Sequence, residues 1–293
     1  MQPLSAGISE IRQRVLLLKE IPPLPLIAQR ILSMPPEADV REMAEIIEQS
    51  PELSARLLGM ANSAYFAWPG GVHTIQDAIY KVLGFKLVKS LVLGVTLSEV
   101  FDIRKCRGFR VERYWFTAIA TDQMSQGLFP SLPPFLRWNL DNIHMNGLLH
   151  NLGLAVLAHL YPGDLSAALV LRPDTAELST TERIRNVLGL LPTQAGGWLA
   201  RKWHLPRDVV LVMEHHKEQE YRGDFWPISL LVGYCERQAQ RLFTETGICP
   251  EPETEALLGI DREIFDRMRL KIDGQLDNLL SMASYMATGE QNG

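Results

Sequence analysis

Histidines are the residues of this chain that could carry chemistry, and two short stretches stand out. His150 and Asn151 lie together in the apolar run Gly147 to Leu160, and His215 and His216 are adjacent further along the chain. A polar side chain in an apolar helix costs free energy unless it is hydrogen bonded, so a single histidine of this kind is most often a bonded core residue. Adjacent helical residues point about 100° apart, so only one of the second pair can face a common site.

Other constellations give weaker signals for a catalytic site. No serine lies in a Gly-x-Ser-x-Gly context, so the sequence does not support a hydrolase nucleophile of that kind. Gly70-Gly71 predicts a turn, whereas Gly196-Gly197 and Gly94 predict close approaches between helices rather than phosphate-binding loops.

Several short motifs follow one another in a fixed order between Ile21 and Arg241. Gly147-Leu-Leu-His-Asn-Leu-Gly resembles the HD-superfamily signature Leu-Leu-His-Asp-Ile-Gly. The other motifs resemble successive stretches of HDOD domains, and the chain is therefore identified as resembling the HDOD family. These motifs are Ile21-Pro-Pro-Leu-Pro, Ser50-Pro-Glu-Leu-Ser-Ala-Arg-Leu-Leu, Ala61-Asn-Ser-Ala-Tyr-Phe, Ala78-Ile-Tyr-Lys-Val-Leu-Gly, Gly197-Trp-Leu-Ala-Arg-Lys-Trp-His-Leu-Pro and Met213-Glu-His-His.

The resemblance implies a set of positions for metal ligands, because related phosphohydrolases hold catalytic ions with histidines and aspartates. In this sequence, the implied positions fall on or near Thr117, His150, Asn151, Pro192, His215 or His216, and Glu236. An amide and a proline therefore stand where ligands are expected. Loss of the charged aspartate at Asn151 is expected to cost several kcal/mol of metal affinity. We expect no catalytic residues, no cofactor and no tightly bound metal, although the remaining histidines and Glu236 could hold a divalent ion weakly.

The elements that must position these residues are predicted to be helices. Apolar residues recur at spacings of three and four, and alternating strand patterns are scarce, which predicts an all-α multi-helix bundle. Helix boundaries are marked by capping residues, prolines and glycines. Predicted starts are at Asp39, Ser50-Pro51, Thr74, Pro206 and Pro227, and predicted ends are at Gly84, Pro162 and Gly247.

The best candidate for a boundary within the chain is Asp102 to Arg110, which is rich in charge between two apolar stretches. It predicts an N-terminal helical subdomain, residues 1–105, packed on an HD-like helical bundle with a degenerate metal site, residues 106–293. Phe129-Pro-Ser-Leu-Pro-Pro predicts a stiff loop, and the stretch Ile248 to Glu255 predicts another.

Composition narrows the possible functions. The chain is 46% hydrophobic with a net charge of −5, which argues against a broad nucleic-acid footprint. Cys106, Cys235 and Cys249 are far apart and predict free thiols in a reducing cytoplasm. No signal peptide is evident at the first methionine, and the apolar stretches are too short and too polar for membrane spans.

The resemblance implies a non-enzymatic bacterial regulatory protein that acts through protein–protein contacts. Its expected partners are sensor kinases, response regulators or cyclic-di-GMP enzymes. The alternatives are a metal-dependent phosphohydrolase with an unusual ligand set, or a nucleotide-binding sensor without turnover. One candidate interface is formed by Asn62, Ser63, Tyr65 and Phe66, either between the two helical parts or with a partner. The simpler interpretation of these four residues is a helix C-cap followed by core aromatic side chains.

Overall fold

The computed structural model describes residues 19–35, 38–63, 65–66, 68–137, 142–170, 178–244 and 247–288, and every regular element in these ranges is a helix. The all-α prediction is therefore confirmed. The α-helices are α2 (Leu26–Ser33), α3 (Val40–Ile47), α4 (Pro51–Ala61), α5 (Ile75–Asp77), α6 (Phe85–Glu99), α7 (Val111–Leu128), α8 (Ile143–Leu149), α9 (Leu152–Leu160), α10 (Pro162–Leu169), α11 (Thr180–Leu188), α12 (Pro192–Lys202), α13 (Arg207–His215), α14 (Trp226–Arg241), α15 (Pro252–Leu258), α16 (Arg262–Asp273) and α17 (Leu276–Thr288). A π-helix, η1 (Ala78–Leu83), and a 3₁₀ turn, η2 (Phe129–Ser131), complete the set.

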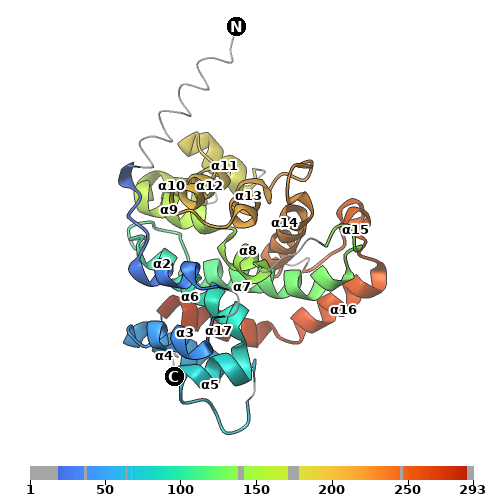
Figure 1. Ribbon diagram of the computed structural model, residues 1–293. Helices are drawn as coiled ribbons and strands as arrows, with labels where there is room; N and C mark the ends of the chain where they lie inside the picture. The colour runs from blue at the N-terminus through green and yellow to red at the C-terminus, as the bar shows by residue number, and fades with distance from the viewer. Residues whose placement is uncertain are drawn as a thin grey trace.

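Helix α7 is the axis on which the other helices pack. It lies across the middle of the molecule, with α9 to α13 above it and α3 to α5 below it in the view of Figure 1. Most of its side chains from Tyr114 to Leu128 are buried, and its main neighbours are α8, α14 and α17. A helix buried on nearly all sides must be surrounded by other elements, and this arrangement places α8 and α14 around the candidate site.

Most helix starts lie where the capping residues predict them. The side chains of Asp39, Ser50 and Thr74 each accept a backbone N–H at the start of α3, α4 and α5, at distances of 3.0, 3.2 and 3.1 Å. Gly84 follows η1 with a φ of 82°, a conformation that glycine adopts without strain. Pro206 directly precedes α13, and Pro227 lies in the first turn of α14.

Two predicted boundaries are wrong, whereas Pro162 marks a helix end as predicted, because α9 ends at Leu160. Pro162 also begins α10, since proline fits the first turn of a helix. Pro252 likewise begins α15, so the predicted loop from Ile248 ends earlier than expected. Helix α14 ends at Arg241, well before Gly247, although this glycine does have a positive φ of 58°.

The apolar run that carries His150 and Asn151 is broken at these two residues. Helix α8 ends at Leu149 and α9 begins at Leu152, so the polar pair forms a turn rather than lying inside one continuous helix as predicted. Asparagine competes for backbone hydrogen bonds and favours helix ends, which explains the position of the break. Beyond the break, a Cβ added to Gly153 would lie 1.9 Å from Pro192 O, so α9 and α12 touch through their backbones.

The segment Asp102 to Arg110 contains no helix and connects α6 to α7. The division of the chain at residue 105 stays a prediction. Contacts do cross it, because α17 packs on both α7 and α4. A Cβ added to Gly59 of α4 would lie 2.5 Å from the ring of Tyr285 of α17, so these two helices are in close contact.

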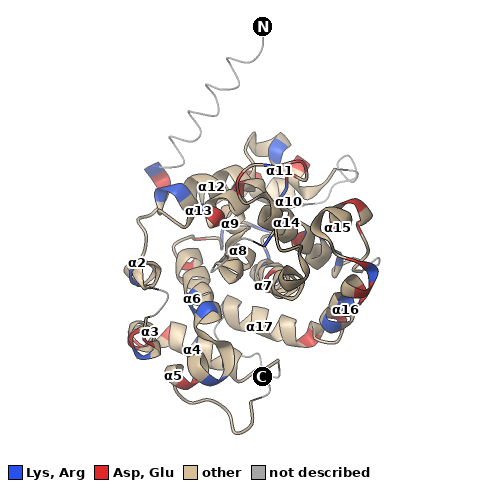
Figure 2. Ribbon diagram, turned by 45° about the vertical axis from the view of Figure 1, so that its right-hand side comes forward, with Lys and Arg blue, Asp and Glu red and all other residues tan. Residues whose placement is uncertain are grey.

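Charged residues lie mainly on the outer helices. Figure 2 shows both signs of charge along α16, whereas α7, α8 and α17 carry few charges in the same view. The three cysteines are free, as predicted. Among the described helices, none alone has the length and apolar character to span a bilayer. The segments Ile143–Leu160 and Pro162–Leu169 have that length and character only when taken together, and the chain bends by 118° between them.

Candidate functional site

Three of the predicted ligand positions, His150, His216 and Glu236, form one buried cluster. None of the three is more than 2% exposed. Their ligand atoms all lie within 4.8 Å of one another. His150 follows α8, His216 follows α13, and Glu236 lies in α14, so the cluster forms where three separate elements meet.

Buried contacts outside the cluster set the positions of these elements. Asn146 of α8 donates a 3.0 Å hydrogen bond from Nδ2 to Asp208 Oδ2 of α13, which fixes the two helices one to two turns before their histidines. Gly233 of α14 lies against the chain at His216, because a Cβ there would be 1.8 Å from His216 O. The backbone after α13 is thus pressed onto α14 one turn before Glu236.

Both imidazoles present the same nitrogen to the carboxylate. His150 Nδ1 lies 2.7 Å from Gly147 O and His216 Nδ1 lies 2.9 Å from Val212 O. A carbonyl oxygen only accepts hydrogen bonds, so Nδ1 is assigned as the protonated nitrogen in each ring. The Nε2 atoms lie 3.7 and 3.5 Å from Glu236 Oε1 and Oε2, respectively, and neither has a hydrogen-bond partner. Imidazoles that ligate metals are often held by a backbone carbonyl in this way.

A lysine supplies positive charge to this cluster. Lys217 Nζ forms an ion pair with Glu236 Oε2, and Gln240 Nε2 donates a 2.9 Å hydrogen bond to Glu236 Oε1. Burial alone would raise the pKa of the Glu236 carboxyl, but the positive charge of Lys217 beside it favours the ionised form, and that pKa lies well below its usual range. Burial lowers the pKa of His216 to about 3, so its imidazole is neutral at neutral pH.

The arrangement fits a catalytic divalent ion poorly, although the donor types are suitable. The two unpartnered Nε2 atoms and one carboxylate are ligands that zinc, iron or manganese accept. Both carboxylate oxygens are already engaged, one by an ammonium group and the other by an amide. An ion shared by His216 and Glu236 would have to bind the same carboxylate oxygen that Lys217 contacts.

The remaining implied ligand positions do not add donors. Thr117 is buried in α7, and its hydroxyl donates a 2.9 Å hydrogen bond to Arg113 O of the same helix. Pro192 begins α12 and packs against Gly153. Asn151 is half-buried in the turn before α9, and its side chain does not cap that helix.

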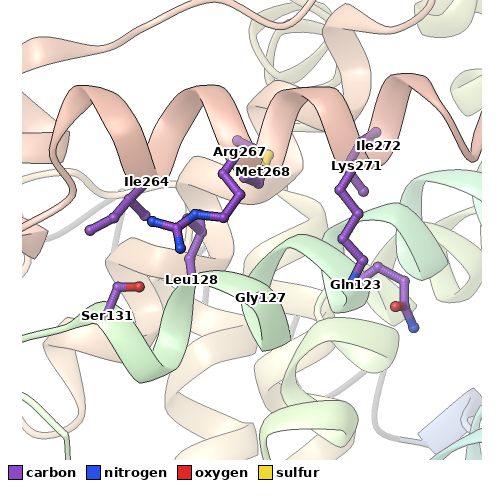
Figure 3. Close-up of a pocket in the computed structure, with 9 residues that line it drawn as sticks. All are labelled: Gln123, Gly127, Leu128, Ser131, Ile264, Arg267, Met268, Lys271 and Ile272. Carbon is purple, nitrogen blue, oxygen red and sulfur yellow. The ribbon is translucent and has the colours of Figure 1, made fainter.

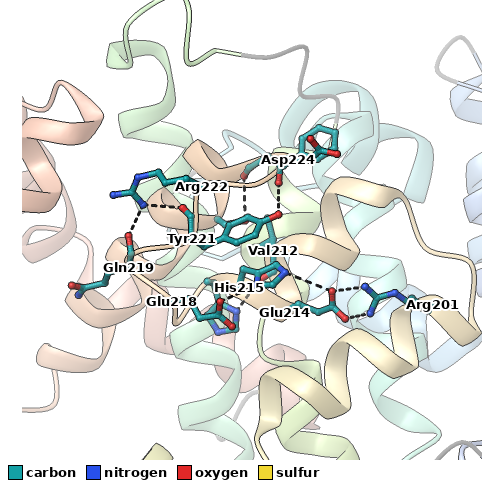
Figure 4. A network of polar contacts seen from close by, with 12 residues as sticks. Arg201, Val212, Glu214, His215, Glu218, Gln219, Tyr221, Arg222 and Asp224 are labelled. Atoms are coloured by element: carbon teal, nitrogen blue, oxygen red, sulfur yellow. Dashed lines mark hydrogen bonds and ion pairs between the residues drawn. The ribbon is translucent and has the colours of Figure 1, made fainter. Parts of the chain in front are cut away.

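His215 points away from the cluster, so only one of the two adjacent histidines faces it, as predicted. Its ring stacks on Tyr221 with centroids 3.8 Å apart and planes 3° apart, and its Nδ1 lies 3.1 Å from Glu218 Oε2 (Figure 4). Tyr221 in turn donates a 2.9 Å hydrogen bond to Asp224 O. This network ties down the segment that begins with Lys217.

The four candidate interface residues lie after the end of α4, where Ser63 is buried, Tyr65 and Phe66 are half-buried and Asn62 is exposed. Asn62 closes the loop after α4, accepting a 2.7 Å hydrogen bond from Val72 N and donating a 2.8 Å bond to Val72 O. Ser63 is buried, and Phe66 packs edge-on against Tyr65 with ring centroids 4.8 Å apart. The Tyr65 hydroxyl donates a 2.6 Å hydrogen bond to Gln123 Oε1 of α7, so it joins the two predicted parts of the chain.

The sequence profile of the HDOD domain matches residues 21–219. The chain belongs to the HDOD family. An uncharacterized protein of Treponema pallidum (strain Nichols) is 25% identical over 237 residues, which are 78% of this HDOD chain but only 44% of that relative.

Two solved structures have the same fold as this chain. A candidate signal transduction protein from Marinobacter aquaeolei VT8 superposes with a TM-score of 0.78 at 25% identity, over 96% of this chain and 66% of that one. An HDOD domain protein of unknown function from Geobacter sulfurreducens gives a TM-score of 0.70 at 18% identity, over 94% and 99% of the two chains. The expected family and the all-helical architecture are therefore confirmed.

Two hollows in the described part of this HDOD protein lie elsewhere. One cavity of 210 Å³ is formed between α16 and the end of α7, where Arg267 reaches over Leu128 and Lys271 extends toward Gln123 (Figure 3). A second hollow of 530 Å³ lies between α2, with the residues before it, and Trp203. Neither includes a predicted ligand position, so sequence resemblance and surface shape indicate different places.

Proposed function

We propose that this HDOD protein is a non-enzymatic module of bacterial signal transduction that acts through protein–protein contacts. The observation that carries the proposal is the set of residues at the implied metal-ligand positions, which we call the old catalytic centre. Of the implied ligand positions, Asn151 is a neutral amide, Pro192 is a proline and Thr117 is bonded within its own helix. The one carboxylate, Glu236, is paired with a lysine.

The proposed partners are proteins of two-component or cyclic-di-GMP signalling: sensor kinases, response regulators or cyclic-di-GMP enzymes. The similarity to the candidate signal transduction protein from Marinobacter aquaeolei VT8 supports this context. A rigid all-helical body suits such a role, because a packed helical surface can present a fixed interface without catalytic chemistry.

The experiment combines metal analysis, activity and capture of partners. The purified full chain should contain substoichiometric iron, manganese and zinc, and should not hydrolyse phosphate monoesters or diesters. Affinity capture from the native cell should retain a signalling protein, and a titration with the purified partner should show saturable binding. Stoichiometric metal, lost together with hydrolysis in H150A, would overturn the proposal.

A metal-dependent phosphohydrolase is the second candidate, favoured by the two unpartnered imidazole nitrogens beside Glu236. His150, His216 and Glu236 would then be the residues that hold the ion. The same assays distinguish the two functions, because the second requires activity that depends on added metal and on His150.

A further inference from the structure

The cluster of His150, His216 and Glu236 contains a buried carboxylate that needs a counter-charge. Glu236 is completely buried, and an ionised carboxylate in such a place is costly unless a cation or several donors compensate it. In related phosphohydrolases, bound metal ions supply that charge. In this chain, the neighbouring cation is the ammonium group of Lys217, which is joined to the protein by its own side chain.

The position of Lys217 matches the place that an ion would need. Glu236 Oε2 is the oxygen that lies 3.5 Å from His216 Nε2, and it is also the oxygen that Lys217 contacts. An ion bridging His216 and Glu236 would therefore have to displace the ammonium group. The other carboxylate oxygen, which lies 3.7 Å from His150 Nε2, is occupied by the amide of Gln240.

The chain around Lys217 holds its side chain in this place. The residue directly follows His216, whose carbonyl is pressed against Gly233 of α14. On its other side, the stacked rings of His215 and Tyr221 and the hydrogen bond from Tyr221 to Asp224 order the segment (Figure 4). The Lys217 side chain is only 28% exposed, so its ammonium group has limited freedom to leave the carboxylate.

We infer that Lys217 is the built-in cation of this site, which takes the place of a divalent metal ion, and that its removal uncovers a three-donor metal site. The inference rests on the proposed function and gives it a cause, since the permanent cation keeps the old catalytic centre closed to metal. The ligand class that the uncovered site would take is a transition-metal dication that accepts two imidazoles and one carboxylate.

The test uses Co²⁺ as a spectroscopic probe on the full chain, with any affinity tag removed. We expect K217A to bind one Co²⁺ per chain with a d–d absorption band, and to do so at least about tenfold more tightly than the unmodified protein, because a unit positive charge beside the ion is gone. The matched control K217R keeps a cation and should behave like the unmodified protein. The double variant H150A/K217A should lose the band.

Thermal unfolding gives a second measurement that does not depend on the spectrum. K217A leaves Glu236 unpaired and should unfold at a lower temperature than the unmodified protein, and added Co²⁺ should restore part of that loss. The unmodified protein should show no such shift. Where K217A does not fold, K217Q keeps a hydrogen-bond donor without the charge and takes its place in both measurements.

Two results would overturn the inference. One is equal Co²⁺ affinity in the unmodified protein and K217A, and the other is no Co²⁺ binding by folded K217A or K217Q. A hydrolysis assay on the same samples separates this failure from that of the proposed function. If the unmodified protein binds Co²⁺ as tightly as K217A but hydrolyses no phosphate ester, only the inference fails. If the loaded unmodified protein hydrolyses one, the proposed function fails as well.

Discussion

His216 is expected to make the folded state sensitive to acid. Burial lowers the pKa of its imidazole from the ordinary 6.5 to about 3. Above pH 6.5 the imidazole is neutral in both the folded and the unfolded chain. Between about pH 6.5 and 3 the unfolded chain binds a proton that the folded chain does not, so this residue lowers stability by about 1.4 kcal/mol for each pH unit of acidification.

Urea unfolding of H216N at pH 7, 6 and 5 checks this expectation. Asparagine can donate to Val212 O in place of Nδ1 but does not titrate. The unfolding free energy of H216N should therefore fall less on acidification than that of the unmodified protein, by the slope that corresponds to uptake of about one proton on unfolding. The control H73N removes an exposed histidine and should retain the full loss. An unchanged slope in H216N would contradict the assignment of this effect to His216.

At the same scale, sequence reasoning found most of the cluster but not its cation. The resemblance indicated His150 and Glu236, which the structure brings together, and the helical rotation of 100° implied that only one of the two late histidines faces inward. The choice between His215 and His216 needed the structure, since both residues stand at the end of the same helix, α13. Lys217 was missed, although a signal existed: Glu236 directly follows the apolar stretch of α14 that ends at Cys235, and a buried carboxylate there requires a counter-ion.

Among the elements, the contact between α9 and α12 is the most restrictive. A Cβ on Gly153 would lie 1.9 Å from Pro192 O and 2.5 Å from Gly196 N, and these backbone atoms cannot move without separating the helices. We expect G153A to lose about 3 kcal/mol or more of unfolding free energy in urea denaturation.

G163A, in α10, is the matched control because no heavy atom lies within 4 Å of its added Cβ. That variant should change stability by no more than about 1 kcal/mol. Equal effects of the two substitutions would contradict this view of the contact.

Local sequence chemistry predicted elements best where a cap or a close contact defines them. Ser50 and Thr74 act as N-caps because a short hydroxyl side chain can reach the free backbone N–H groups of a first turn. The interpretation of Gly94 as a close-packing point is also confirmed, since its Cβ would lie 3.2 Å from the ring of Trp115. The break at His150 and Asn151 was not predicted, because apolar periodicity continues across it and hides the preference of Asn151 for a helix end.

For the molecule as a whole, the sequence predicted the fold class and family but not the contact between α17 and α4. Apolar spacing shows which residues are buried, whereas it does not show which helix each buried face contacts. Helix α17 comes last among the described elements, yet it packs against α4 near the start of the chain and against the central helix α7. Composition alone, from which the division at residue 105 was drawn, does not reveal the contact between α17 and α4, because this contact joins residues far apart in sequence.

Arg56 is the residue that ties these distant parts together most directly. It is buried in α4, where its Nη1 donates a 3.2 Å hydrogen bond to Met286 O of α17 and lies 3.3 Å from Glu99 Oε1 at the end of α6. Replacement by methionine keeps the apolar stem but removes the charged donor, so R56M should lose about 2 kcal/mol of unfolding free energy.

The part of the molecule that R56M destabilises shows whether Arg56 joins α4 to α17 or only stabilises its own helix. Because α17 would lose its anchor to α4, its backbone amides should exchange with solvent faster in R56M than in the unmodified protein, whereas amides of α12 should change least. R41M, on the exposed side of α3, is the matched control and should alter neither stability nor exchange. If R56M lowers stability without faster exchange in α17, Arg56 stabilises α4 alone, and the contact between α4 and α17 must depend on apolar packing such as that of Gly59 against Tyr285.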